Sequence, residues 1–178
     1  MDFRNDPVDP DTLPTYEAVT LNPVSPRFPF YRVLSHLVFW LPLAAVLWVM
    51  PDVGALPAAL TDGAAYVIAG AGGVLALLSW FEAERRAYGL REHDLIYRSG
   101  LIIQRTTIVP ISRIQHVEAA SGPLERAFDL MRLVCYTAGG ASADLVVQGL
   151  PAETAERLRQ HLLEKLPDES EGTYHEAE

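Results

Sequence analysis

The sequence VLSHLVFWLPLAAVLWVM spans residues 33–50, and AAYVIAGAGGVLALLSWF spans residues 64–81. Neither stretch contains an Asp, Glu, Lys or Arg residue. Each has 18 residues and would be about 27 Å long as an α-helix, which approaches the bilayer core of about 30 Å. Two core helices of a soluble domain are the alternative, although so small a domain rarely needs two charge-free helices. We therefore predict a transmembrane hairpin over residues 27–81, with these two stretches as its spans.

The charges around the hairpin predict its orientation. The connection between the spans carries Asp52 and Asp62 and no base. Arginines flank the other ends of the spans: Arg27, Arg32, Arg85, Arg86 and Arg91. Under the positive-inside rule, such flanks remain in the cytoplasm. We expect a multi-pass protein of the cell (inner or plasma) membrane with both termini cytoplasmic. We do not expect a cleaved signal, because the first span follows an acidic leader rather than a short basic segment.

Small residues recur every four positions along the second span, at Ala65, Ala69 and Gly73. Such a stripe allows another helix to approach closely. Its partner would be either the first span or a span of another subunit, and the sequence leaves both open. His36 lies one turn inside the first span. We expect a neutral imidazole near the head groups there, with a functional ionisable residue as the alternative.

The net charge of −9 belongs to the two tails. Residues 1–26 carry five acids and one Arg, and residues 167–178 carry five acids and no base. We expect both tails to be disordered, because neither is apolar enough to fold alone. The charge excludes a basic nucleic-acid-binding protein. Cys135 is the one cysteine, which excludes an intramolecular disulfide, and we expect it to be a buried structural thiol.

Residues 82–166 have the pattern of an antiparallel β unit that is closed by a helix. Runs rich in Ile, Val, Tyr and Thr are separated by turn signals such as Ser99-Gly100 and Gly139-Gly140. We expect a short helix over residues 122–130 and a longer one from Pro151 to Leu166. The longer helix has one apolar stripe, formed by Ala155, Leu158, Leu162 and Leu166. This pattern predicts an α+β protein whose cytoplasmic domain follows the membrane hairpin.

Several short motifs in this order resemble a known family. They are R-x-Y-x-L at residues 86–90, V-P-x-x-R-I-Q at residues 109–115 and G-P-L-x-R-x-F at residues 122–128. Behind a membrane hairpin, they are similar to those of the bacterial pleckstrin-homology-like (bacterial PH domain) membrane proteins of the YdbS type. The resemblance covers residues 27–166. It implies a PH-like fold, an antiparallel β-barrel or sandwich capped by the C-terminal helix. It also implies relatives that protect the envelope against antimicrobial peptides, often beside a larger protein with repeated copies of the domain.

The sequence offers no catalytic constellation. Its histidines lack close-spaced pairing for a metal, and its serines lie outside any G-x-S-x-G motif. We therefore predict no enzyme, no metal, no cofactor and no small-molecule substrate. Four arginines are candidate ligand or membrane-surface contacts: Arg85, Arg86, Arg91 and Arg113. Basic residues near a span are attracted to an anionic leaflet. A solvated, ion-paired surface is the alternative, and for Arg113 a structural role at a strand crossover is another.

The favoured functional hypothesis is a non-catalytic scaffolding or interaction module at the inner leaflet. Such a module would form a homo-oligomer or assemble with a larger related membrane protein. A subunit of a membrane transporter or pore is one alternative. A lipid-active enzyme is the other.

Overall fold

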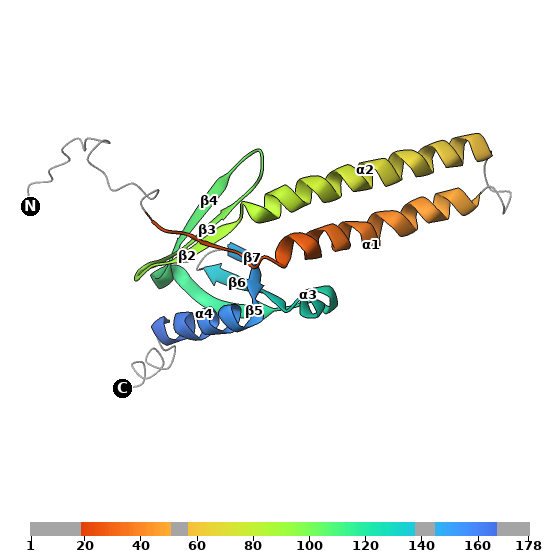
Figure 1. Ribbon diagram of the computed structural model, residues 1–178. Coiled ribbons are helices and arrows are strands. Elements are labelled where there is room, and N and C mark those ends of the chain that lie inside the picture. Colours follow the sequence, from red (N-terminus) through yellow and green to blue (C-terminus); the bar gives the residue numbers. More distant parts are fainter. Residues whose placement is uncertain (1–18, 51–56, 138–144, 167–178) are drawn as a thin grey trace, which may run out of the picture.

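The computed structural model describes residues 19–50, 57–137 and 145–166. The predicted C-terminal tail, most of the N-terminal tail, part of the connection between the spans and the Gly139-Gly140 turn lie outside these residues. In the described part, two long antiparallel helices extend from one side of a β-rich unit (Figure 1).

The two helices are α1 (Phe28–Val49) and α2 (Ala58–Glu84). Both are long and apolar enough to cross a bilayer, with mean hydropathies of 1.7 for α1 and 1.8 for Ala59–Glu84. Only 6% of the first apolar window and 22% of the second is buried inside the protein. Core helices of a soluble domain would be mostly buried, whereas lipid-facing helices expose apolar side chains to the hydrocarbon. The exposed apolar surface therefore fits the predicted membrane hairpin.

Helices α1 and α2 pack through small side chains on one face of α2. The buried residues of this face include Thr61, Ala65, Ala76 and Ser79. Gly72 is also buried, and a Cβ atom there would lie 2.6 Å from the Cβ of Trp40. Close approach of the two backbones at this point therefore requires a glycine.

Of the predicted stripe only Ala65 is buried against α1, while Ala69 lines an open groove beside Ala44 of α1. Ala69 and Gly73 are exposed, and a Cβ atom at Gly73 would have no neighbour within 4 Å. The reason is the helical period of 3.6 residues, which turns a strict four-residue repeat away from its starting face. The buried positions of α2 instead combine spacings of three, four and seven residues, which together keep to one face of the helix. Within this chain the stripe therefore contributes to the packing of the spans at Ala65 and not at Gly73.

The β unit contains two antiparallel sheets. The first has the strand order β1-β2-β3-β4: β1 (Asn22–Pro23), β2 (Ala87–Leu90), β3 (Asp94–Ser99) and β4 (Arg105–Pro110). The second has the order β5-β6-β7: β5 (Ile114–Ala120), β6 (Leu130–Thr137) and β7 (Leu145–Pro151). A 3₁₀ turn (Ile111–Arg113) leads from the first sheet to the second, and the short helix α3 (Pro123–Ala127) lies between β5 and β6.

The C-terminal helix α4 (Ala152–Lys165) closes the β unit. It packs against β5, β6 and β7 through Ala155, Leu158 and Leu162, three residues of its predicted apolar stripe. Their core partners include Leu133 and Val147, which are fully buried. The predicted architecture is confirmed: a two-helix hairpin precedes antiparallel sheets that are capped by a C-terminal helix.

The folded part begins before residue 27, where the sequence placed the end of the N-terminal tail. Asn22 and Pro23 pair with Tyr88 and Ala87 of β2, and Ser25 is buried. The backbone N–H of Ser25 donates to the carbonyl of Gly149 at 2.8 Å. Composition could not predict this strand, because backbone hydrogen bonds to an existing sheet edge hold it rather than apolar side chains of its own.

Candidate functional site

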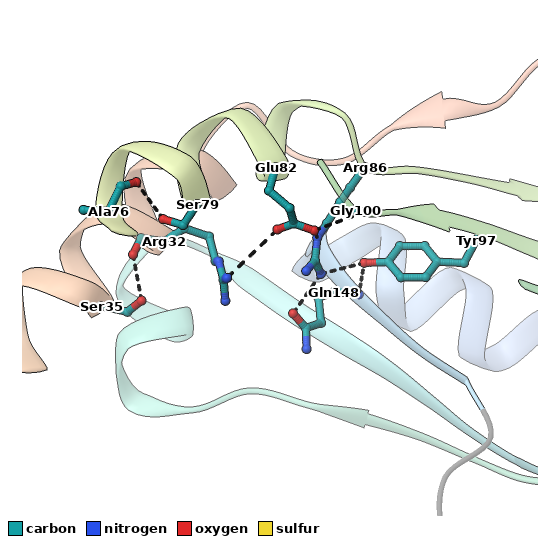
Figure 2. Close-up of polar contacts among 9 residues, drawn as sticks. All are labelled: Arg32, Ser35, Ala76, Ser79, Glu82, Arg86, Tyr97, Gly100 and Gln148. Atoms are coloured by element: carbon teal, nitrogen blue, oxygen red, sulfur yellow. Dashed lines mark hydrogen bonds and ion pairs between the residues drawn. The ribbon is translucent and has the colours of Figure 1, made fainter. Parts of the chain in front are cut away.

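Arg86, just after α2, is the centre of the contacts that join the helices to the sheets (Figure 2). Its Nε donates to Oε1 of Glu82 at 2.6 Å. Its Nη1 donates to Oη of Tyr97 at 2.8 Å and to Oε1 of Gln148 at 2.9 Å. The guanidinium carbon also lies 5.4 Å from the ring centroid of Phe28. One side chain therefore contacts α1, α2, β3 and β7.

The Arg86–Glu82 pair is largely buried, with side-chain exposures of 12% and 17%. Burial acts to lower the pKa of Arg86, but the hydrogen bonds and charge interactions with Glu82 and Tyr97 outweigh it and raise this pKa. The guanidinium is therefore a fixed positive charge. Removal of one partner from a buried ion pair leaves an uncompensated charge, which is strongly destabilising. The pair holds the junction between the helices and the sheets.

The start of α1 is fixed against β7 at the same junction. Phe28 is almost completely buried, and its ring covers Gly149. Gly149 has φ +81°, and a Cβ atom there would lie 2.6 Å from Cγ of Phe28. Only glycine fits such a position, because it tolerates the left-handed backbone and leaves room for the ring.

A groove of about 470 Å³ opens beside the junction, between α1, α2 and the loop that joins β3 to β4. At its polar end, Nη2 of Arg32 lies 4.0 Å from Oε2 of Glu82. The Nε of Arg32 and the Oε2 of Glu82 are buried and have no hydrogen-bond partner among the described residues. His36 lines the same groove. Buried polar atoms usually have partners, so these two atoms mark a polar end of an otherwise apolar groove.

The structure brings Arg85 and Arg86 together but separates them from Arg91 and Arg113. Arg85 is exposed at the end of α2, and its Nη1 donates to the carbonyl of Leu101 at 3.3 Å. Arg91 pairs with Asp94, a hydrogen bond that raises the pKa of Arg91. Arg113 is exposed at the end of the 3₁₀ turn. The start of β3 pairs with the end of β4, so Arg91 and Arg113 lie at the opposite end of this hairpin from the helices.

Sequence reasoning missed Glu82, Tyr97 and Gln148 as partners of Arg86. The four-residue spacing of Glu82 and Arg86 was the one local signal, because residues i and i+4 are neighbours on a helix. This pair is not part of the solvated, ion-paired surface that was the alternative for the arginines. Cys135 is fully buried, and burial raises the pKa of its thiol to about 12, which confirms the predicted structural thiol. Within residues 19–50, 57–137 and 145–166, no group of three or more His, Cys, Asp or Glu residues could hold a metal ion.

Comparison with known proteins places this arrangement in a family. Residues 36–166 match the family model of the bacterial PH domain. The chain is 32% identical over 75 residues to the transmembrane protein YdbS of Bacillus subtilis. The aligned segment covers 42% of this chain and 45% of YdbS. It is 27% identical over 90 residues to the transmembrane protein YdbT of the same organism. That aligned segment covers 50% of this chain and 18% of YdbT. The matched segments thus span less than half of either relative, and no solved structure matches. Because the family match includes most of the hairpin, the strands β2 to β7 and α4, the chain belongs to the bacterial PH domain family, as a membrane protein similar to YdbS.

Proposed function

We propose that this membrane protein is a non-catalytic scaffold whose hairpin holds the PH-like domain in a fixed orientation at the inner leaflet. The observation that carries the proposal is the Arg86 junction, in which one buried guanidinium contacts both helices and both sheets. A domain on a flexible linker would sample many orientations. A domain held by a buried, hydrogen-bonded ion pair presents one defined surface to partners.

The cytoplasmic placement of the domain is supported by the arginines at its membrane side. Arg27, Arg32 and Arg85 lie at the ends of α1 and α2 that join the β unit. Asp62 lies near the other end of α2. Positive residues flank the cytoplasmic ends of membrane helices. Both termini and the PH-like domain are therefore proposed to face the cytoplasm.

The proposed partner is a second copy of the chain or a larger membrane protein of the same family. Ala69, Gly70 and Gly73 form a small-residue surface of α2 that α1 leaves exposed. Such surfaces allow close packing of helices in lipid. The similarity to YdbT supports a larger partner, because 90 aligned residues are only 18% of that protein. The family resemblance extends the proposal to assemblies that protect the envelope against antimicrobial peptides.

The test is the oligomeric state of the full chain after extraction from its native membrane into mild detergent. We expect a defined oligomer or a complex with a related membrane protein. Gly73→Ile should shift this species towards the monomer, because the added side chain separates the helices. Ala71→Ile is the matched control, since Ala71 is a small exposed residue of the same turn that faces another direction. Oligomers of Ala71→Ile should stay intact.

Three results would contradict the proposal. A pure monomer from native membranes would remove the scaffold. Ion conductance by the purified oligomer in planar bilayers would favour a pore subunit. Hydrolysis of lipid by a preparation free of other proteins would favour an enzyme.

A further inference from the structure

We propose that the loop between β3 and β4, residues 100–104, is inserted into the leaflet beside the helices, so that a membrane phospholipid fills the groove between this loop and α1–α2. The inference rests on the membrane hairpin of the proposed function. It does not depend on the scaffold role or on which side of the membrane the domain lies.

The tip of the loop exposes two isoleucines. Ile102 is 88% exposed and Ile103 is 72% exposed. Single exposed apolar residues are normal on a protein surface, but adjacent ones that continue a larger apolar surface mark a contact with protein or membrane. Here the apolar surface that continues beyond the loop is the lipid-facing side of α2, which carries the exposed Leu75 and Leu78.

The loop lies beside the end of α2 that joins the β unit (Figure 1). Leu101, Ile102 and Ile103 line the groove opposite Leu75 and Leu78. Leu75 precedes Glu82 by seven residues, which places it about 10 Å further along the helix axis, at about 1.5 Å per residue. The tip of the loop therefore borders the same groove as these leucines, while the base of the loop is held at the charged end of the helix.

Two contacts fix the loop to the end of α2. The backbone N–H of Gly100 donates to Oε1 of Glu82 at 3.3 Å (Figure 2), and Arg85 donates to the carbonyl of Leu101 at 3.3 Å. Gly100 has φ +103°, and a Cβ atom there would lie 2.0 Å from the carbonyl oxygen of Ile103. The tight turn thus requires glycine. The two contacts and the tight turn together hold the apolar tip of the loop beside the helices.

Charged residues surround the base of the loop and leave its tip apolar. Arg98 and Arg105 lie at the ends of β3 and β4 and are exposed. Bases at this level are attracted to the phosphates of an anionic leaflet. At the polar end of the groove, Nη2 of Arg32 lies 4.0 Å from Oε2 of Glu82. A phospholipid has the same order, with its head group at the polar end and its acyl chain against the leucines and isoleucines. This order of polar and apolar groups along the groove favours a phospholipid as its occupant.

The test measures the depth of the loop in the full chain. A bimane fluorophore is attached at Ile102→Cys, and the protein is placed in nanodiscs of phosphatidylethanolamine and phosphatidylglycerol. Nitroxides on the acyl chains and aqueous iodide are the two quenchers. Val38→Cys on the exposed apolar side of α1 is the control within the membrane, and Leu163→Cys on α4 is the control in water. The parent chain, whose Cys135 is buried, controls for background labelling.

We expect acyl-chain nitroxides to lower the fluorescence at residue 102 by at least a factor of two, as at residue 38, and iodide to have little effect. Quenching of residue 102 by iodide but not by nitroxide lipid, as at residue 163, would overturn the inserted loop while the quenching at residue 38 keeps the hairpin. Loss of lipid quenching at residue 38 as well would overturn the hairpin and the loop together.

Discussion

Arg86 donates from Nε to Oε1 of Glu82 at 2.6 Å across one turn at the end of α2, and the two side chains are only 12% and 17% exposed. The same residue types occur at the same spacing in α4, where Arg157 pairs with Glu153 and both side chains are 77% exposed. The two pairs have the same residue types and the same four-residue spacing, but the first is largely buried and the second is exposed. Their comparison separates the contribution of burial from that of helix spacing.

Arg86→Ala should lower the free energy of unfolding by about 3–5 kcal/mol, because it leaves the largely buried carboxylate of Glu82 without its closest charged partner. Arg157→Ala should change it by less than about 0.5 kcal/mol, since exposed pairs on a helix contribute little. Unfolding of the full chain by SDS titration in mild micelles measures both. Equal effects of the two substitutions would show that the Arg86 junction is not a stabilising element.

Gly149→Ala should destabilise the protein by more than about 1 kcal/mol, because a left-handed backbone is unfavourable for a residue with a Cβ. The clash of this Cβ with the Phe28 ring at 2.6 Å increases the effect and should displace the start of α1. Gly63→Ala is the control, since a Cβ at this helical position has no neighbour within 4 Å. Thermal unfolding midpoints of both variants check the prediction, which fails if Gly149→Ala unfolds like the parent.

Gly72→Ala and Gly73→Ala should differ although they are neighbours in α2. A Cβ at residue 72 would lie 2.6 Å from the Cβ of Trp40, so the spans must separate to accommodate it. At residue 73 a Cβ meets open space. We expect SDS to unfold Gly72→Ala at a lower mole fraction than the parent and Gly73→Ala at an unchanged one. The reverse order would mean that the two helices are rotated relative to the structure.

The free energy of unfolding should fall above pH 9 because of the buried thiol of Cys135. Burial raises the pKa of its thiol from 9.0 to about 12, so the unfolded chain loses this proton first as the pH rises. The contribution is present in full below pH 9 and is lost between pH 9 and pH 12. The stability difference between the parent and Cys135→Ala should therefore be constant from pH 6 to pH 8 and shrink above pH 9. A difference that stays constant to pH 11 would contradict the buried thiol.

Local properties of the sequence were enough to predict the hairpin and the main elements of the β unit that follows it. The stretches at residues 33–50 and 64–81 carry no charge, and length and hydropathy alone mark a membrane span. The apolar stripe of α4 likewise predicted its buried face, at Ala155, Leu158 and Leu162. These features depend on residues that lie within a few turns of one another.

The junction could not be predicted in the same way. Tyr97 and Gln148 follow Arg86 by 11 and 62 residues, and only the packing of β3 and β7 brings them to the guanidinium. The sequence also left open which helix Ala69 and Gly73 would face, since the position of α1 decides which small residues are buried. The separation of Arg91 and Arg113 from the helices follows from the pairing of β3 with β4, which composition does not reveal.

The central claim is that α1 and α2 cross the membrane with the β unit on the cytoplasmic side. Labelling of Asp62→Cys and Leu163→Cys in intact cells with a membrane-impermeant maleimide tests it most directly, because Cys135 of the parent is buried. We predict labelling of residue 62 in intact cells and of residue 163 only after lysis. Labelling of residue 163 in intact cells, or of residue 62 only after lysis, would contradict the account.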